Sequence, residues 1–415
     1  RSTTQMAYDQ LLAEGYMESR PCRGYFVSHL DELVETGPSG AEEMETTAEP
    51  DAGWRVDFSP RGIDLDSFPY HVWRKLSRNT LVDDNKEMFH SGNHQGEPGL
   101  REAIRSYLHS ARGVNCSPEQ IIVGAGSEYL LMLLSQILEG KHVIAMENPT
   151  YKQAYRVFRS LDYEVCPVEM DANGMEPELL TRSGANVAYV MPSHQFPTGV
   201  VMPVGRRQEL LKWAVEAPDR YIIEDDYDSE FRYRGKPIPA LQGMDRSGRV
   251  IYLGTFSKCI APAIRVSYLV LPTHLLLRYR SQTSFYASTV SRIDQNILYQ
   301  FLAGGYFERH LNRMRAVYKT KHDLLLEQIE PLRERFEIRG EHAGIHILLT
   351  SRQGESEEQL IQKAEEAGVK VYGLSSYFIH PQHNHRPATV VLGYASLSEE
   401  QIVEGIRLLM ECWGA

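Results

Sequence analysis

Short apolar runs separated by amphipathic stretches dominate the chain from residue 54 onward. Six runs rich in β-branched residues predict strands, at 121–123, 143–146, 187–190, 221–223, 250–253 and 266–271. Apolar residues at helical spacing lie between several of these runs. Strands that alternate with helices are typical of a mainly parallel α/β sheet with helices on both faces. The pattern therefore predicts a large lobe over about 80–310. A smaller α+β lobe is expected over about 311–415, together with the part before residue 80.

The first 29 residues follow a different pattern. Hydroxyl residues at 2–4 can cap a helix start, an apolar face covers 6–12, and Gly15 can end the helix. Two short strand-like runs then flank a turn that contains Pro and Gly, which predicts a hairpin. Residues 30–53 carry eight Asp or Glu and no Lys or Arg, so they predict a flexible acidic linker.

Composition narrows the class of protein. The formal net charge of −11 excludes a surface that binds nucleic acid everywhere, so any DNA contact has to be local. No apolar run reaches the roughly 18–20 residues that a membrane span needs. The start of the chain is polar and does not resemble a signal peptide. Five scattered cysteines without metal spacing fit a reducing cytoplasm.

The strongest candidate chemistry follows the predicted strand at 250–253. The run LGTFSK places the hydroxyls of Thr255 and Ser257 before Lys258, and Arg265 comes seven residues later. An amine that attacks an aldehyde must lose its proton, which suits a partly buried lysine. Hydroxyls and a guanidinium suit a phosphate dianion. Taken alone, this segment is more typical of a surface loop.

Carboxylates follow the predicted strand at 221–223. Asp225 lies at the carboxyl end of a strand, where active sites of open α/β sheets lie, and such a carboxylate can keep a pyridine nitrogen protonated. The phenol of Tyr227 can bond a ring oxygen of the same ligand. A metal-binding acid cluster and a solvated loop are the alternative interpretations of this run.

Two further strand ends carry compatible groups. The run IIVGAGSE turns through glycines into a predicted helix at Ser127 and Glu128, and free N–H groups at a helix start bind phosphate. Tyr151 follows another strand and can stack on a flat ring, although a packed core tyrosine fits equally well. Together, the four strand ends supply the amine, pyridine partner, phosphate cradle and stacking ring that pyridoxal 5′-phosphate (PLP) requires.

Long motifs carry a family resemblance over nearly the whole chain. They include VDFSP with FP, GEPGLR, PSHQFPTG, EDDYDSEFRY and the block around Lys258. Residues 54–415 resemble fold-type I aminotransferases, and residues 1–29 resemble the end of a GntR-type winged helix. That combination resembles the MocR/GabR-type transcriptional regulators, with the winged helix truncated.

The resemblance implies roles for the candidate residues. Lys258 would form the Schiff base with PLP, Asp225 would pair with the pyridine nitrogen, and Tyr227 would bond O3′. Tyr151 would stack on the ring. The phosphate would be held by Ser127 and Glu128 through backbone N–H groups and by Thr255, Ser257 and Arg265. An amine or amino acid effector would be sensed through aldimine formation. Chains would pair as head-to-tail homodimers.

The resemblance also implies an operator DNA partner. The helix from Ser2, Thr3 and Thr4 would be the recognition helix, with Arg20 and Arg23 in the wing. A dimerisation helix and hairpin is the alternative. Residues 1–29 carry no net charge, and the two helices that precede a recognition helix are absent from this chain. We therefore expect DNA binding from the intact protein and not from this fragment.

The chain departs from ordinary aminotransferases at two positions. Phe196 stands where an Asn commonly bonds O3′, and Gln195 or His194 could replace it. Val391 stands where many members place the Arg that clamps the substrate carboxylate, so fast transamination of α-amino acids is not expected. A metabolic aminotransferase remains the alternative to a regulator.

A histidine-rich loop near the C-terminus raises the question of a metal. His380, His383 and His385 lie in the run HPQHNH. A solvated turn is favoured over a metal site there, and no metal is predicted.

Overall fold

The computed structural model describes residues 2–28, 53–81, 86–233, 238–380 and 387–414. The chain divides into two compact units, residues 1–52 and 53–415. The helices are α1 (Ser2–Ala13), α2 (Tyr70–Thr80), α3 (Pro98–Arg112), α4 (Ser127–Leu138), α5 (Lys152–Ser160), α6 (Pro177–Arg182), α7 (Val204–Val215), α8 (Thr273–Gln282), α9 (Arg292–Ala303), α10 (Tyr306–Gln328), α11 (Glu357–Glu366) and α12 (Glu399–Trp413). Short 3-10 turns are η1 (Lys86–Phe89), η2 (Pro118–Gln120), η3 (Gln242–Met244), η4 (Pro262–Ile264), η5 (Glu330–Glu334) and η6 (Leu374–Tyr377).

The strands form one large sheet and three smaller ones. They are β1 (Met17–Arg20), β2 (Gly24–Val27), β3 (Val56–Asp57), β4 (Ile121–Gly124), β5 (Val143–Asn148), β6 (Glu164–Asp171), β7 (Gly174–Met175), β8 (Val187–Val190), β9 (Tyr221–Asp226), β10 (Val250–Thr255), β11 (Ser267–Val270), β12 (Phe336–Arg339), β13 (His346–Ser351), β14 (Val369–Lys370), β15 (Tyr372–Gly373) and β16 (Thr389–Gly393).

The N-terminal unit is a helix followed by a hairpin. Helix α1 ends before Gly15, which adopts a positive φ of 79°. Strands β1 and β2 then pair antiparallel, with Met17 opposite Val27. The helix and hairpin expected in this segment are therefore present.

The large sheet of the second unit has eight strands in the order β4-β11-β10-β9-β8-β5-β6-β7. Strands β10, β9, β8, β5 and β6 run parallel, while β11 pairs antiparallel with both β4 and β10. The predicted mainly parallel sheet is confirmed, although β9 and β10 run two or three residues further than the apolar runs alone indicate.

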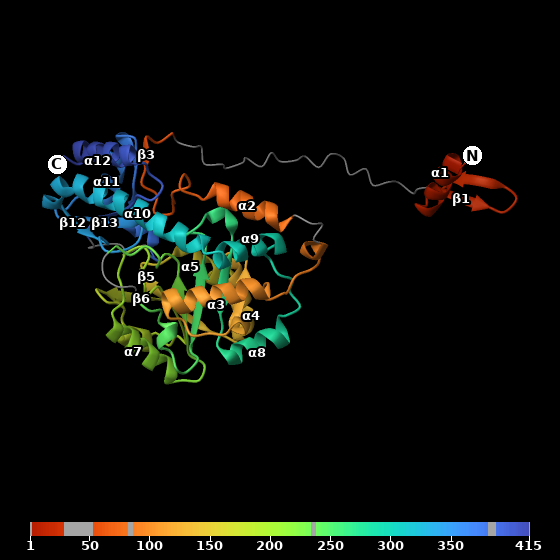
Figure 1. Cartoon of the computed structure of the whole chain (residues 1–415), viewed down its shortest axis with the longest axis horizontal. Coiled ribbons are helices and arrows are strands. Elements are labelled where there is room, and N and C mark those ends of the chain that lie inside the picture. The colour runs from red at the N-terminus through yellow and green to blue at the C-terminus, as the bar shows by residue number, and fades with distance from the viewer. Residues whose placement is uncertain (1, 29–52, 82–85, 234–237, 381–386, 415) are drawn as a thin grey trace. The chain divides into compact units, whose positions relative to one another are not determined.

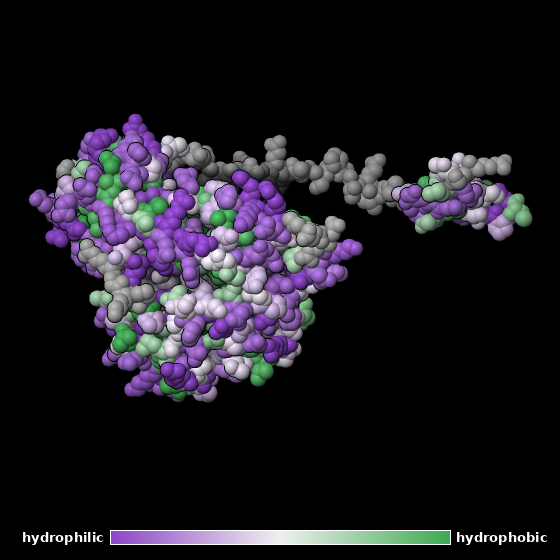
Figure 2. Space-filling model, in the orientation of Figure 1, coloured by the Kyte–Doolittle hydropathy of each residue, from purple (hydrophilic) through white to green (hydrophobic). Residues whose placement is uncertain are grey.

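Helices cover both faces of this sheet (Figure 1). Along β4, Ile122 packs into the core that α4, α5 and α8 form, whereas Ile121 and Val123 pack with α3, α9 and α10 on the other face. Because both faces are covered, the central strands read as continuous apolar runs rather than as alternating ones. On the outer surface shown in Figure 2, hydrophilic residues predominate.

A smaller sheet, β12-β13-β16-β15, packs with α10, α11 and α12 to form the second lobe. The segment that precedes the large lobe belongs to this second lobe, because β3 pairs parallel with β14. A Cβ at Gly393 would lie 2.2 Å from the carbonyl of Ser59, so the N-terminal segment passes directly against β16. In the part of the chain that the structure describes, no helix is both long and apolar enough to cross a membrane.

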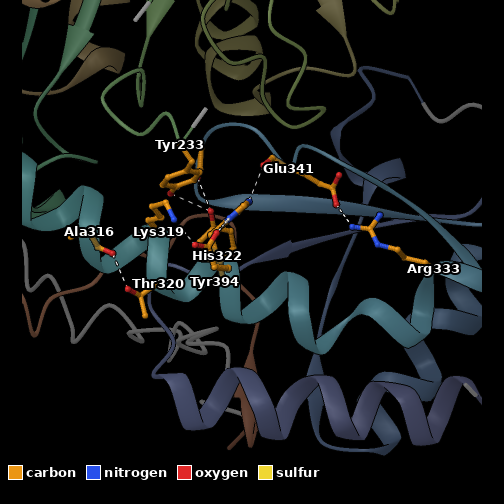
Figure 3. A network of polar contacts seen from close by, with 10 residues as sticks. Tyr233, Ala316, Lys319, Thr320, His322, Arg333, Glu341 and Tyr394 are labelled. Atoms are coloured by element: carbon orange, nitrogen blue, oxygen red, sulfur yellow. Dashed lines mark hydrogen bonds and ion pairs between the residues drawn. The ribbon is translucent and has the colours of Figure 1, made fainter. Parts of the chain in front are cut away.

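Polar contacts join the two lobes around the turn before β13 (Figure 3). The carbonyl of Gly344 accepts hydrogen bonds from the hydroxyls of Tyr233 and Tyr394, both at 2.8 Å. His322 stacks on Tyr233 with ring centroids 4.8 Å apart, and its Nε2 lies 3.0 Å from the carbonyl of Glu341. The turn is thus fixed by α10, by the residue that follows β16 and by the segment that follows β9.

A buried ion pair joins the end of α3 to the end of β9. Arg112 donates to Asp226 at 2.8 Å, to the carbonyl of Ile238 at 2.7 Å and to Ser193 Oγ at 2.6 Å. Both partners of the ion pair have side chains at most 5% exposed. Removal of one partner from such a pair leaves an uncompensated charge in the interior.

We expect Arg112→Met to lower the free energy of unfolding by about 3–5 kcal/mol, because Asp226 would lose its countercharge. Urea denaturation of the full chain measures this change. Arg182→Met is the matched control, since Arg182 pairs with Glu178 on the surface at 75% and 86% exposure. The control should cost less than about 1 kcal/mol. Equal losses in the two variants would contradict this role for Arg112.

Candidate functional site

Four segments of the large sheet meet at one edge. Strands β4, β9 and β10 end there, and β11 begins there because it runs in the opposite direction. Ser267 at the start of β11 lies opposite Gly124 of β4 and opposite Thr255 of β10. Residues that follow the three strand ends therefore lie beside residues that precede β11, and these segments carry most of the predicted site.

The start of α4 forms a cradle suited to an anion. Gly126 is the N-cap residue and adopts a φ of 96°, and a Cβ there would lie 2.2 Å from Nη2 of Arg265. The positive φ favours glycine at this position. The backbone N–H groups from Ser127 onward point out of the first helical turn. The hydroxyls of Thr255 and Ser267 lie 2.9 Å apart nearby. Donors, a cation and hydroxyls fit a phosphate dianion here.

The cradle already contains a carboxylate. Glu128 accepts a hydrogen bond from Arg265 Nη2 at 2.8 Å, and the two side chains are 29% and 53% exposed. The family resemblance implies a role for Glu128 through its backbone N–H only, so this side-chain contact is an addition. An incoming anion has to compete with Glu128 for the guanidinium.

Lys258 lies in the turn after β10, three residues beyond Thr255. Its amine donates to the carbonyl of Arg61 at 2.8 Å. Burial lowers the pKa of Lys258 to about 8, Asp228 opposes this shift, and Arg61 adds to it. A larger fraction of the amine is therefore neutral near physiological pH than for an exposed lysine. The group is suited to attack on a carbonyl carbon.

Asp225 is buried near the end of β9 and accepts a hydrogen bond from the hydroxyl of Tyr189 on β8. Burial raises the pKa of Asp225 to about 7, the Tyr189 hydrogen bond opposes this, and Asp226 and Asp228 add to it. A buried carboxylate of this kind gains most from a cationic partner. A protonated ring nitrogen would supply one.

Tyr227 and Asp228 follow β9 directly and share one histidine. Nδ1 of His194 lies 3.0 Å from the Tyr227 hydroxyl and 2.8 Å from Oδ2 of Asp228. Burial raises the pKa of the Tyr227 phenol well above its usual value, and the charges of Asp228 and Asp225 raise it further. The phenol therefore stays protonated and can act as a hydrogen-bond donor.

Tyr151 stands at the N-terminus of α5 with its ring among the same groups. Burial raises the pKa of its phenol to about 12, and the charges of Glu128 and Asp225 contribute to the shift. Its ring packs edge-on against Phe196, with centroids 6.1 Å apart. Phe196 packs edge-on against Tyr227 as well, so the three aromatic rings form one cluster near the end of β9.

The predicted DNA-contacting residues belong to the N-terminal unit. Ser2, Thr3 and Thr4 form the first turn of α1. Arg20 pairs with Glu18 at 3.5 Å and lies 4.8 Å from the ring centroid of Phe26, and Arg23 is in the hairpin turn. Their contacts with DNA stay a prediction. In the histidine-rich loop, His383 and His385 lie outside the described residues.

Several contacts could not be found from the chain alone. Tyr189 is one residue of a buried strand, and only the pairing of β8 with β9 places it beside Asp225. The Arg61 carbonyl comes from a segment almost 200 residues away from Lys258. For His194 a signal existed. Phe196 stands where an Asn is common in the family, so a polar residue close by was a candidate to replace that Asn.

Comparison with known proteins agrees with this geometry. The family model described as "Aminotransferase class I and II" matches residues 64–408. A multiple substrate aminotransferase from Thermococcus profundus superposes with a TM-score of 0.77 at 28% identity, over 87% of this chain and 91% of that one. The kynurenine aminotransferase of Pyrococcus horikoshii, solved with PMP, gives 0.76 at 26% identity, over 86% and 90%.

Relatives that match over almost the whole chain are named as regulators rather than as aminotransferases. The chain is 41% identical to the HTH-type transcriptional regulator YdeL of Bacillus subtilis, over 100% of this chain and 89% of that protein. It is 34% identical to the rhizopine catabolism regulatory protein MocR of Rhizobium meliloti, over 99% and 85%. The chain therefore belongs to the aminotransferase class I and II family, in the branch of HTH-type transcriptional regulators that includes MocR.

Proposed function

We propose that this protein is a transcriptional regulator that binds PLP through Lys258 and senses PLP itself or an amine or amino acid at the same site. The observation that carries the proposal is the position of Lys258, with its pKa lowered to about 8, at the sheet edge that also holds Asp225 and the Gly126–Arg265 cradle. When bound, PLP supplies an aldehyde for the lysine amine and a ring that withdraws electrons while its nitrogen is protonated.

Each residue of the edge has a role in this proposal. Lys258 provides the attachment point, Asp225 holds the ring nitrogen protonated, and Tyr227 donates to the ring oxygen. Tyr151 stacks on the ring. The phosphate is held by the backbone N–H groups of Ser127 and Glu128. The side chains of Thr255, Ser257 and Arg265 hold it as well.

Sensing is favoured over rapid turnover because a substrate clamp is missing at one position. Val391 is fully buried in the middle of β16 and packs into the apolar core with Leu348 and Tyr377. A side chain in this environment offers no charge to a substrate carboxylate. A metabolic aminotransferase is the second candidate, supported by the likeness to the Thermococcus profundus enzyme.

The N-terminal unit is assigned to DNA in this proposal. Its helix and hairpin correspond to the recognition helix and wing of a winged helix, with Arg20 and Arg23 on the hairpin. The intact protein would act in the cytoplasm as a head-to-tail homodimer. Exposed aromatic side chains of the second unit support a self-association surface, since Phe89 and Phe285 are 76% and 75% exposed.

Titration of the purified chain with PLP tests the proposal. We expect an absorbance band from the lysine-linked cofactor in the wild type, and its loss in Lys258→Ala because no amine remains at the site. Lys141→Ala is the control, since Lys141 is exposed beyond the end of α4. Candidate amines and amino acids are then added to find the one that shifts the band. A band that persists in Lys258→Ala would place the attachment elsewhere and reject the proposal.

The rate of PLP attachment should depend on pH through Lys258. Only the neutral amine attacks an aldehyde, so the rate should rise with pH and level off above about 8, the pKa to which burial lowers this group. A lysine-containing model peptide, with a pKa of about 10.4, should still gain rate at pH 9–10. Stopped-flow absorbance measures both. A chain that follows the peptide profile would contradict the lowered pKa.

Glu128→Gln should tighten PLP binding. The substitution removes a negative charge that faces the phosphate and competes for Arg265, and we expect a roughly tenfold lower Kd, equivalent to about 1.4 kcal/mol. The gain should shrink at high salt, because both side chains are partly exposed. Fluorescence titration measures the Kd. Glu102→Gln, which alters an exposed pair with Arg105, should leave it unchanged.

A further inference from the structure

One nitrogen of a buried imidazole lies beside both the Tyr227 hydroxyl and a buried carboxylate. The imidazole of His194 contacts both the Tyr227 hydroxyl and Asp228 through one nitrogen, at 3.0 and 2.8 Å. Its side chain is 2% exposed and that of Asp228 is 1% exposed. The contact is therefore shielded from water, where hydrogen bonds count most.

The two residues that follow His194 in the loop after β8 offer no free polar atom to the Tyr227 hydroxyl. The ring of Phe196 packs edge-on against Tyr227, with centroids 6.1 Å apart, and offers no polar atom. Gln195 is engaged elsewhere, because its Nε2 donates to the carbonyl of Pro149 at 2.8 Å and its Oε1 accepts from the backbone N–H of Thr198 at 3.0 Å. Of Gln195 and His194, His194 is the residue whose polar atom lies beside the Tyr227 hydroxyl.

The proton on His194 can be placed by elimination. Nδ1 faces a carboxylate, which only accepts, so Nδ1 carries the hydrogen and donates to Asp228. Nε2 is buried without a hydrogen-bond partner among the residues described, so a second hydrogen there would be unsatisfied. The neutral tautomer with hydrogen on Nδ1 follows from these two contacts.

Asp228 competes with any ligand for the Tyr227 hydrogen. Its Oδ1 has no hydrogen-bond partner within the described part of the chain, and its carboxylate raises the pKa of Tyr227 both by its charge and by a hydrogen bond with the phenol. Without the imidazole, the phenol is the neighbouring donor that this buried carboxylate would take. With it, Asp228 keeps a donor when the Tyr227 hydrogen turns from the carboxylate to another acceptor.

The second lobe keeps the imidazole in place. A Cβ on Gly344 would lie 1.9 Å from Cε1 of His194, so the backbone of that turn lies directly against the ring. The turn is itself held by the hydroxyls of Tyr233 and Tyr394 (Figure 3). His346 also borders the ring, with centroids 5.1 Å apart.

We propose that His194 is a positioning residue that donates to Asp228 through Nδ1 and thereby leaves the Tyr227 hydroxyl free to donate to a ligand oxygen. The inference deepens the proposed function and rests on it, because the ligand oxygen is the ring oxygen of PLP. His194 thus performs, through Tyr227, a task for which the usual residue is missing at Phe196. No contact between His194 and the cofactor is required.

The test measures the absorbance band of the cofactor bound to this chain rather than the activity of the chain. The Kd for PLP and the pH midpoint of the band are determined for the wild type, His194→Leu, His194→Asn, Tyr227→Phe and the Leu/Phe double variant. An Asn amide lies near the position of Nδ1 and keeps the donor, whereas Leu removes it.

The pH midpoint also depends on the charged and titratable groups that face the cluster from every packed element. They are Asp225, Asp226, Asp228, Lys258, His346, Arg112, Arg232, Tyr233 and Tyr394.

We expect His194→Leu to raise the Kd by about tenfold, the loss of one hydrogen bond. Its band midpoint should move up by about one pH unit, because a donor to the ring oxygen stabilises the more negative, deprotonated form. His194→Asn should remain within about twofold of the wild type in Kd. In the Tyr227→Phe background, His194→Leu should add almost nothing, since the phenol that transmits its effect is absent.

Three results would overturn the inference. They are a His194→Leu chain that matches the wild type, an undiminished effect in the Tyr227→Phe background, and an Asn variant as impaired as Leu. Should His194→Leu fail to fold, as judged by circular dichroism, His194→Gln replaces it, because its amide reaches the Nε2 position and leaves Asp228 without its donor. A wild type that forms no lysine-linked band rejects the proposed function itself, and this outcome is separate from the other three.

Discussion

Burial of three carboxylates within four residues is the constraint on which the site depends. Asp225, Asp226 and Asp228 lie at the end of β9 and just beyond it, each at most 6% exposed. Charges taken out of water are costly unless each has a donor or a countercharge. Asp226 has the guanidinium of Arg112 and Asp228 has the imidazole of His194. Asp225 has a phenol, and no cation pairs with it among the residues that the structure describes.

The partners of these carboxylates come from separate elements and tie them together. Arg112 ends α3, His194 follows β8, and the turn that encloses His194 belongs to the second lobe. The position of the smaller lobe and the hydrogen bonding of Tyr227 are therefore connected through a few contacts. In the proposed function a ligand supplies the cation for Asp225, which is the behaviour expected of a binding site rather than of a structural ion pair.

Sequence patterns located the strand ends but not the contacts across them. The runs at 121–123 and 250–253 were sufficient to place α4 and Lys258, because periodicity and strand-end chemistry are local properties. The antiparallel direction of β11 was not evident from its apolar run, and neither was the pairing of Glu128 with Arg265, which depends on that direction. Contacts made by register between distant segments have no local signal, and His194 was a candidate only because a family motif made Phe196 conspicuous.

Arg265 adopts a left-handed backbone conformation, with φ 52° and ψ 36°, at the turn into β11. A residue with a Cβ pays roughly 1–2 kcal/mol for this geometry, whereas glycine does not. The Cβ of Arg265 is therefore a source of backbone strain at the turn that places its guanidinium beside Gly126. Glycine at this turn would relieve the strain, but it would also remove the guanidinium that pairs with Glu128.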